Sequence, residues 1–263
     1  MKLAVKVERR HQKIREMLIK NDVCFIEDFL HNLKISEATL RNDLTYLESV
    51  GVLKRIRGGA ISTDGTPKDN DINIRNAVCR DEKRLIARYV VDNLLKSGMT
   101  ITLDPGSTCR EIAREIVEND IVCTVITNNF LAADLLIKAN TVTLYLAGGK
   151  YDRDLAAFHD EQTNYCLAKL HSDLYFLAPD GIDAEGQITV SGTDEHFAKL
   201  EMLKMAKEVV VVADHTKIGR CALKYLCDIK TVSQLVVDDG ISEDQLIKLR
   251  SSGISISVAK MYI

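Results

Sequence analysis

The sequence lacks the cysteine and histidine patterns of disulfide-stabilised or zinc-binding proteins. Its seven cysteines, an odd number, are scattered from Cys24 to Cys227 without a C-x-x-C pair. His159, His171, His196 and His215 show no metal-ligand spacing, so we expect these side chains to be hydrogen-bonded within the protein or solvent-facing. These absences predict reduced thiols, no bound metal and no cofactor.

Long apolar runs are also missing. No uninterrupted apolar stretch is long enough to span a bilayer, and the basic segment 1–15 has no apolar core of the signal-peptide type. We therefore expect a cytoplasmic protein without a membrane partner.

Aromatic residues are scarce, at 5% of the chain, and tryptophan is absent. A content of 46% hydrophobic and 28% charged residues is nevertheless ordinary for a globular protein with a sizeable core. The length of 263 residues favours two domains. Residues 1–63 carry 12 Lys/Arg and 8 Asp/Glu, whereas the remainder carries 23 and 30. A basic head on an acidic body suits a protein that contacts nucleic-acid phosphates at one end.

The basic head shows the pattern of three short helices and a hairpin. Apolar residues recur at helical spacing within 8–20, and a second short helix is predicted over 26–33. Ser36 is a natural N-cap for a third helix, which ends at Gly51. Residues 52–59 then alternate in part and end in two glycines, which predicts a β-hairpin.

Three helices and a basic hairpin within residues 1–61 predict a small N-terminal winged helix-turn-helix domain that binds double-stranded DNA. The residues expected to contact DNA are Ser36, Ala38, Thr39, Arg41, Asn42, Lys54, Arg55 and Arg57. Arg can pair with guanine and Asn with adenine, each pair giving ~1–3 kcal/mol of discrimination. The cations of the hairpin would contact phosphates without reading bases. A plain helical packing module with a solvated basic face is the alternative.

The composition changes after this head. Residues 62–71 are rich in Ser, Thr, Asp, Gly, Pro and Asn, so we expect a linker over 62–80. In residues 81–263, short apolar strands alternate with helical stretches, which predicts an α/β domain with a mostly parallel sheet and helices on both faces. The expected strands are 100–104, 122–127, 141–147, 173–178, 209–213 and 235–237, and the expected helices are 82–95, 108–118, 131–139 and 195–207.

Polar and glycine-rich strings follow strand after strand in this second domain. Ligands of open parallel sheets bind beyond the carboxyl ends of the strands, so these strings predict one effector pocket. The candidate effector-binding residues in these strings are Asp104, Gly106, Ser107, Thr108, Thr127, Asn128, Gly148, Gly149, Lys150, Gly181, Asp183, Asp214 and Lys217. Glu195 and Lys199, one turn apart in the predicted helix 195–207, are two further candidates, which do not follow a strand. The string 106–108 precedes a helix and could hold a phosphate through backbone N–H groups. Any one of these strings taken alone is more typical of an ordinary turn.

The head resembles the DeoR family of bacterial regulators. Residues 36–47 read S-E-A-T-L-R-N-D-L-T-Y-L and residues 57–60 read R-G-G-A, against the family's S-x-x-T-[IV]-R-R-D-L-x-x-L and R-x-x-G-G-A. Asn42 stands in place of the family's second Arg, which removes a cation from the reading face. Phe25 stands where a Ser or Thr commonly caps the second helix, a cap worth ~1 kcal/mol.

The second domain is similar to the sensor domain of the same family. The matching pieces are Arg75, Glu82-Lys83, Ile86-Ala87, Asp104, Gly106–Thr108, Ile126–Asn128, Leu146–Gly149, Gly181–Asp183, Glu195, Lys199 and Asp214–Gly219. This resemblance implies a fold akin to ribose-5-phosphate isomerase and a sugar phosphate or related metabolite as effector. Asp160 and Ala178 replace the family's usual Gly, and Asp152 replaces a frequent Arg. The added acid would disfavour some anionic ligands.

Together these patterns predict a regulator without catalytic residues, most consistent with a repressor of a carbohydrate-metabolism operon that responds to a phosphorylated sugar. One winged helix covers one half-site, so we expect a homo-dimer or higher homo-oligomer. The alternative is a sugar-phosphate isomerase fused to a helix-turn-helix, because residues 180–185 read D-G-I-D-A-E and resemble the isomerase motif D-G-A-D-E. A protein-interaction module without a small ligand is a third possibility.

Overall fold

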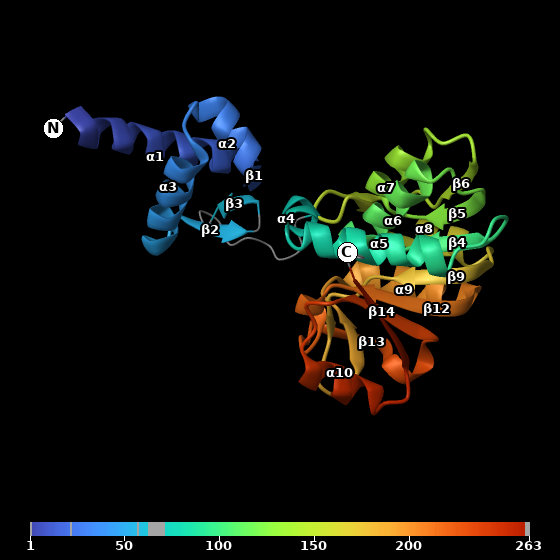
Figure 1. The fold of residues 1–263 in the computed structure, drawn as a ribbon. Helices are drawn as coiled ribbons and strands as arrows, with labels where there is room; N and C mark the ends of the chain where they lie inside the picture. The colour runs from blue at the N-terminus through green and yellow to red at the C-terminus, as the bar shows by residue number, and fades with distance from the viewer. Residues whose placement is uncertain (1, 22, 57, 63–71, 261–263) are drawn as a thin grey trace. The chain divides into compact units, whose positions relative to one another are not determined.

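The computed structural model describes residues 2–21, 23–56, 58–62 and 72–260. The chain divides into two compact units, Met1–Cys79 and Arg80–Ile263 (Figure 1). Among the described residues, no helix combines the length and apolar character that crossing a bilayer requires.

The first unit contains the three expected helices, α1 (Lys2–Asn21), α2 (Ile26–Leu33) and α3 (Glu37–Ser49). The expected hairpin is formed by β2 (Leu53–Ile56) and β3 (Gly59–Ser62). A third strand, β1 (Val23–Phe25), pairs with the other edge of β3 and gives the order β1-β3-β2. The winged helix-turn-helix architecture predicted from the sequence is therefore confirmed, with one strand more than expected.

Close contact between β1 and β3 explains one of the two glycines of the hairpin. A Cβ atom at Gly59 would lie 2.3 Å from the carbonyl oxygen of Cys24, so only glycine fits at this position of the strand pair. The core beneath the sheet is formed by buried apolar side chains from all three helices, including Ile14, Phe29, Leu40 and Leu47.

The helix ends of the first unit follow the sequence closely. The Ser36 hydroxyl accepts a hydrogen bond from the Thr39 N–H at 3.3 Å, so Ser36 caps α3 as predicted. Phe25 precedes α2 and supplies no side-chain cap, but Asp28 Oδ2 accepts the Phe25 N–H at 3.1 Å. A capping box has two hydrogen bonds, and this one, from the N-cap backbone to the side chain three residues later, is present. It compensates for the absence of a Ser or Thr hydroxyl at position 25.

A short helix, α4 (Ile72–Ala77), lies within the segment expected to be a linker. Ile72, Arg75 and Ala77 are buried, which explains why this stretch is ordered. Residues 63–71, whose composition suggested the linker, lie outside the described residues.

The second unit is built on a seven-stranded sheet in which every pairing is parallel. Its strands, in spatial order, are β15 (Ser255–Ala259), β14 (Gln234–Asp238), β12 (Ala206–Ala213), β9 (Ser172–Leu177), β4 (Thr100–Leu103), β5 (Cys123–Thr127) and β6 (Val142–Leu146). All six expected strands are present, and β15 at the edge was not predicted. The expected α/β fold is confirmed.

Helices cover both faces of this sheet (Figure 1). The expected helices correspond to α5 (Arg80–Asn93), α6 (Ser107–Glu118), α7 (Phe130–Leu136) and α9 (Thr193–Met205), whereas α8 (Glu161–Leu167) and α10 (Glu243–Arg250) were missed. Side chains of α5, α6 and α7 pack on one face with Leu174 and Phe176. Side chains of α8, α9 and α10 pack on the other with Tyr175 and Leu177, as the two-residue period of a strand requires.

Short antiparallel strands complete the second unit. A hairpin joins β7 (Tyr151–Asp152) to β8 (Ala157–Phe158). A separate three-stranded sheet has the order β10 (Gly181–Ile182), β11 (Gln187–Val190), β13 (Lys224–Asp228). Neither was predicted. Strands β7, β8 and β10 have only two residues each, which is too short for a recognisable alternation.

The strand order of the large sheet reverses direction between β4 and β9, and we call this place the switch point. From β4 the chain proceeds outward through β5 and β6, and it then returns to β9 and proceeds the other way through β12, β14 and β15. The connections that follow β4 and β9 therefore diverge and leave a site at their carboxyl ends, where open α/β sheets bind ligands.

Candidate DNA interface and candidate effector site

The outer face of α3 carries the residues predicted to read DNA. Ser36, Ala38, Arg41 and Asn42 are exposed, while Thr39 is half-buried and shares a 2.8 Å hydrogen bond with the Ser36 hydroxyl. The opposite face of α3 is buried in the core. The structure therefore exposes four of these five residues on one side of α3, with Thr39 half-buried beside them.

Two arginines predicted to contact DNA, Arg41 on α3 and Arg55 on β2, are already bound to carboxylates of the same unit. Arg41 Nη2 lies 2.6 Å from Glu37 Oε1 on the preceding turn. Arg55 Nε lies 2.7 Å from Glu48 Oε2, and its Nη1 donates to the Thr45 hydroxyl at 2.9 Å. The Arg55 backbone N–H and guanidinium together lower the pKa of the Glu48 carboxyl. Arg55 therefore fastens the hairpin to α3.

The remaining predicted hairpin cations differ in position. Lys54 is exposed on β2. Arg57 lies outside the described residues.

A buried ion pair that sequence reasoning missed holds α1 against α3. Asp43 is buried and is bound by the Arg10 guanidinium, including a 2.8 Å contact from Nη2, and by His11 Nε2 at 3.0 Å. Burial opposes ionisation of Asp43, but hydrogen bonds from Arg10 and His11 outweigh it and lower the pKa of the carboxyl. His11 also stacks on Tyr46, with ring centroids 5.1 Å apart. The sequence does carry a signal for this ion pair, because Asp43 lies on the same face of α3 as the buried Leu40 and Leu47.

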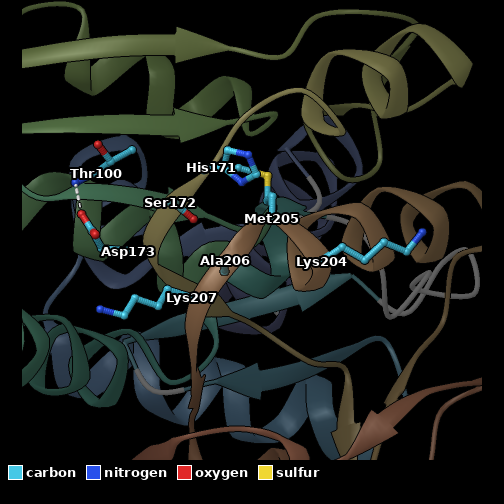
Figure 2. Close-up of a pocket in the computed structure, with 8 residues that line it drawn as sticks. All are labelled: Thr100, His171, Ser172, Asp173, Lys204, Met205, Ala206 and Lys207. Carbon is cyan, nitrogen blue, oxygen red and sulfur yellow. Dashed lines mark hydrogen bonds between the residues drawn. The ribbon is translucent and has the colours of Figure 1, made fainter.

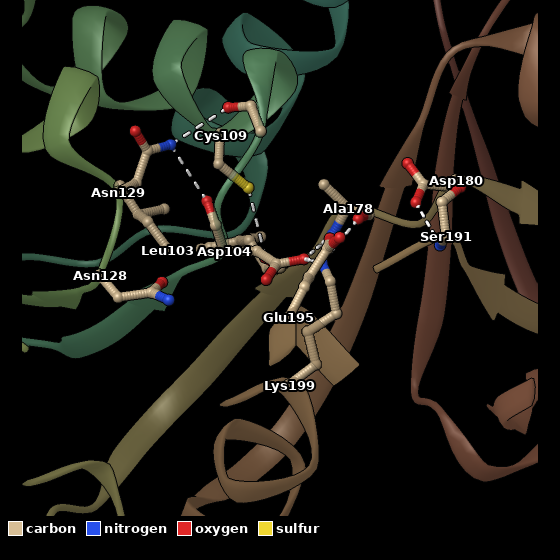
Figure 3. A network of polar contacts seen from close by, with 12 residues as sticks. Leu103, Asp104, Cys109, Asn128, Asn129, Ala178, Asp180, Ser191, Glu195 and Lys199 are labelled. Carbon is tan, nitrogen blue, oxygen red and sulfur yellow. Dashed lines mark hydrogen bonds and ion pairs between the residues drawn. The ribbon is translucent and has the colours of Figure 1, made fainter. Parts of the chain in front are cut away.

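The second unit contains a buried cluster of charged groups at its switch point (Figure 3). Asp104 follows β4, Ala178 follows β9, and Glu195 and Lys199 lie one turn apart on α9. The Lys199 ammonium contacts Asp104 Oδ2, the Ala178 carbonyl oxygen at 3.0 Å and Glu195 Oε1 at 3.2 Å. Asp104 Oδ2 also accepts the Ala178 N–H at 2.8 Å. The structure thus brings together three residues predicted to bind the effector.

Burial determines the protonation behaviour of this cluster. Removal from water raises the pKa of Asp104 to about 6, although the positive charge of Lys199 acts in the other direction. Burial also disfavours the charged form of Lys199, but Asp104 and Glu195 outweigh it and raise the pKa of the ammonium. Lys199 therefore remains a cation.

Five buried polar atoms around this cluster have no hydrogen-bond partner within the described part of the chain. They are Asp104 Oδ1, Asn128 Oδ1, Glu195 Oε2, His159 Nε2 and the hydroxyl oxygen of Tyr175, on which Asp104 and Glu195 act electrostatically. Each parent residue is at most 3% exposed. Unsatisfied polar atoms are rare in protein interiors, and five in one region are typical of a site that takes a polar ligand. His159 differs here from our expectation, because it is neither satisfied nor solvent-facing.

The loops next to this cluster also contain predicted residues. Gly106, at φ 143°, precedes α6 without capping it through a side chain, and Ser107 and Thr108 are buried in its first turn. Thr127 has a supporting position, because its hydroxyl donates to the Leu103 carbonyl oxygen at 2.7 Å and accepts the Asn129 N–H at 3.0 Å.

Asp160 shapes the loop formed by Gly148, Gly149 and Lys150. It caps α8 through Thr163 and accepts the Lys150 N–H at 2.9 Å. A Cβ atom at Gly149, where φ is +150°, would lie 2.4 Å from Asp160 Oδ1 and 2.3 Å from the Thr163 hydroxyl oxygen. The departure from the family pattern at Asp160 therefore has a structural role, and the Lys150 side chain is exposed.

Asp214 and Lys217 lie after β12. Asp214 is buried and lies 3.5 Å from the ammonium of Lys83. Burial opposes ionisation of Asp214, but Lys83 and Thr216 outweigh it and lower its pKa. The sequence indicates Lys83 only through the family resemblance, and its contact with Asp214 was not predicted. Next to it, His215 Nδ1 is 2.7 Å from the buried carboxylate of Asp238.

Gly181 and Asp183 belong to a different environment. Asp183 Oδ1 accepts the N–H groups of Glu185 and Gln187 at 3.0 and 2.8 Å, so it stabilises the turn between β10 and β11. It also lines a separate pocket of about 360 Å³ beside α10. Gly181 is required by the neighbouring chain, since a Cβ atom there would lie 2.2 Å from the Arg220 carbonyl oxygen.

A pocket of about 400 Å³ lies at the opposite end of the large sheet (Figure 2). Thr100, Ser172 and Ala206 place it at the amino ends of β4, β9 and β12, and Lys204 and Lys207 also line it. No predicted effector-binding residue lines it. It also lies away from the switch point, so we assign it no role in effector binding.

Both units match known families. Residues 10–66 match the DeoR-like helix-turn-helix domain, and residues 78–239 match the DeoR C terminal sensor domain. A protein of Escherichia coli O157:H7 named for transcriptional repression of the aga operon is 32% identical over 95% of this chain and 92% of its own length. The lactose phosphotransferase system repressor of Staphylococcus epidermidis is 32% identical over 88% and 91%, and the transcriptional repressor GlcR of Bacillus subtilis is 29% identical over 88% of each chain.

Solved structures align with about half of the chain. Ribose 5-phosphate isomerase A from Methanocaldococcus jannaschii has a TM-score of 0.38 at 23% identity and covers 53% of this chain and 55% of its own. The eIF2B delta of Chaetomium thermophilum has a TM-score of 0.42 at 13% identity, covering 62% and 57%. Similarity at this level does not bear on function.

The buried ion pair of Asp43 is expected to stabilise the first unit. Replacing Asp43 with Asn should lower its free energy of unfolding by about 1–2 kcal/mol, because two partly buried donors lose a charged acceptor. Glu37→Gln, which removes the charge of an exposed pair, should cost less than about 0.5 kcal/mol. Urea unfolding of both variants measures the difference, and equal effects would contradict the assignment.

The raised pKa of Asp104 predicts a pH dependence of stability. From its ordinary value of 3.8 to about 6, the folded protein retains a proton that the unfolded chain has released. The contribution of Asp104 to unfolding free energy should therefore fall by about 2–3 kcal/mol as pH rises through this window. Asp104→Asn should lose this slope in urea titrations at pH 4 to 7. A slope identical to that of the unmodified protein would show that Asp104 titrates normally.

Proposed function

Because the chain belongs to the DeoR family of DNA-binding transcriptional regulators, we propose that it represses a carbohydrate-metabolism operon under the control of a phosphorylated sugar or related metabolite. Its relatives include a lactose phosphotransferase system repressor and GlcR, which support repression and a link to sugars. We also infer that it acts in the cytoplasm, where the operator is.

We propose that α3 reads the operator through Ser36, Ala38, Thr39, Arg41 and Asn42. The exposed position of these side chains on one face supports this role. Arg41 must exchange Glu37 for a base edge, and an exposed pair at this spacing opposes that exchange by only about 0.3–0.5 kcal/mol. Lys54 and, by sequence position, Arg57 would contact phosphates.

The effector site is inferred from one observation, the unpartnered polar atoms at the switch point. Asp104 Oδ1, Glu195 Oε2 and Asn128 Oδ1 are acceptors, so they suit the hydroxyl donors of a sugar. Asp104, Glu195 and Lys199 together carry one net negative charge once Asp104 is ionised, which disfavours a phosphate among them. A phosphate at the start of α6, after Gly106, meets the positive end of a helix instead.

The loop lysines would complete the anion site. Lys217, after β12, and the exposed Lys150, after β6, both follow the carboxyl ends of strands and could approach the phosphate from the rim. Gly148 and Gly149 shape the loop that carries Lys150. Gly181 and Asp183 stabilise the neighbouring small sheet, so we now expect them to support the site without contacting the effector.

A sugar-phosphate isomerase activity is the second candidate. The buried carboxylates and ammonium of Asp104, Glu195 and Lys199 favour it, since isomerisation needs a base and a cation near the reacting carbons. We propose that these groups bind ligand hydroxyls without catalysing a reaction, as expected for a chain whose relatives are named as regulators. Isotope exchange alpha to the carbonyl of pentose and hexose phosphates would reveal turnover.

Repression requires more than one head. A single winged helix covers one half-site, so a homo-dimer or higher homo-oligomer would bind a two-fold or repeated operator. Effector binding would change how the copies associate and hence the spacing of the heads. A coupling of about 1–3 kcal/mol would change operator affinity about 5–150-fold.

Contacts with base edges and contacts with phosphates should respond differently to mutation. Arg41→Ala should relax base preference at one operator position, whereas Lys54→Ala should weaken all sequences alike and reduce the salt slope by about 0.9. Selection of bound duplexes from a random pool, followed by anisotropy titrations at several salt concentrations, measures both. An unaltered preferred sequence for Arg41→Ala would exclude α3 as the reading helix.

The effector site can be tested independently of DNA. Glu195→Gln should weaken binding of the cognate sugar phosphate at least ~10-fold, because a buried acceptor becomes partly a donor. Glu201→Gln, on the same helix but in an exposed pair with Lys204, is the matched control and should bind as tightly as the unmodified protein. Calorimetric titration with pentose and hexose phosphates gives the affinities, and equal affinities for both variants would place the ligand elsewhere.

A further inference from the structure

His159 occupies a fixed position beside the charged cluster. Its backbone N–H donates to the Lys150 carbonyl oxygen at 2.9 Å, directly after β8. The residue is 3% exposed, and Glu195 and Lys199 are the charged groups that act most strongly on its ring. Nε2 has no hydrogen-bond partner among the described residues, so the imidazole is held in place with one nitrogen unsatisfied.

Asn128 determines which ring nitrogen carries the proton. Asn128 Nδ2 donates to the Phe158 carbonyl oxygen at 2.8 Å, and this contact fixes the amide because a carbonyl can only accept. The same Nδ2 lies 3.5 Å from His159 Nδ1, at the long end of hydrogen-bond range. Because an amide nitrogen can only donate, we read Nδ1 as the acceptor of this contact and assign it as unprotonated. In the neutral ring the proton is then on Nε2.

The ring is neutral at neutral pH. Burial lowers the pKa of His159 below its usual value, and the nearby ammonium of Lys199 acts in the same direction, while Glu195 opposes it. His159 consequently adds a hydrogen-bond donor to the site without adding a charge. The unpartnered atoms of Asp104, Asn128 and Glu195 are acceptors, whereas the His159 Nε2–H and the Tyr175 hydroxyl can donate, and of these two only Nε2–H cannot also accept.

We propose that His159 determines the specificity of the effector site by donating its Nε2–H to an oxygen on the carbon chain of the ligand. This inference rests on the proposed function, since it concerns the same site. The ligand must present hydroxyl hydrogens to the three acceptors and a hydroxyl or carbonyl oxygen to His159. A sugar phosphate that lacks this oxygen leaves Nε2–H buried without a partner, and such a loss is costly in a buried polar site.

The test compares sugar phosphates with their deoxy analogues. The probes are pentose 5-phosphates and hexose 6-phosphates, each paired with its 2-deoxy and 3-deoxy forms. The full-length unmodified protein should bind one parent at least ~10-fold more tightly than one of its deoxy analogues. His159→Leu, which preserves bulk, should weaken the parent about 10–100-fold and abolish the discrimination against that analogue. His159→Gln, which retains a donor near the Nε2 position, should restore part of both.

His171→Leu is the matched control, because His171 is an exposed histidine at the opposite end of the sheet. Melting temperatures of all variants without ligand separate loss of folding from loss of recognition. If the unmodified protein binds parents but His159→Leu keeps the same affinities and the same discrimination, the role of His159 is overturned and the regulator proposal stands. If no sugar phosphate binds the unmodified protein, both proposals fail together.

Discussion

The contact of the Lys199 ammonium with two carboxylates is the interaction on which the second unit depends. It links the end of β4, the end of β9 and helix α9, which come from distant parts of the chain. Burying three charges is costly, and apolar residues of similar size often stabilise a core as well or better. We interpret the cluster as a device that keeps the switch point polar and its carboxylates oriented. One oxygen of each carboxylate has no hydrogen-bond partner among the described residues, as our proposal of an effector site requires.

Much of the architecture follows from local sequence signals. The cap at Ser36, the helical spacing of Leu40 and Leu47, and the apolar runs of the large sheet predict elements whose bounds the structure reproduces within a few residues. The order of strings after the strands also places Asp104 at this edge of the sheet, whereas Glu195 and Lys199 were indicated by the family resemblance. These features depend on residues close in sequence or on the general rule for parallel sheets.

Other features depend on contacts between distant residues and could not be foreseen. Strand β1 has three residues and exists because Gly59 permits close approach of the chain near Cys24. Asp183 shares a sequence string with Gly181 that suggests a ligand contact, yet its carboxylate is used by the turn that follows it. His159 lacks a motif of any kind, and only its burial and its neighbour Asn128 make it noticeable.

Ion pairs within the first unit affect how long the protein stays on arbitrary DNA sequences. Arg10, Arg41 and Arg55 are each bound to a carboxylate of their own unit, so three of the twelve Lys and Arg residues of segment 1–63 are paired within it. Attachment to arbitrary DNA is driven almost entirely by uncompensated cations near the phosphates. A head of this kind should therefore leave random sites quickly, and long residence would require simultaneous engagement of two half-sites.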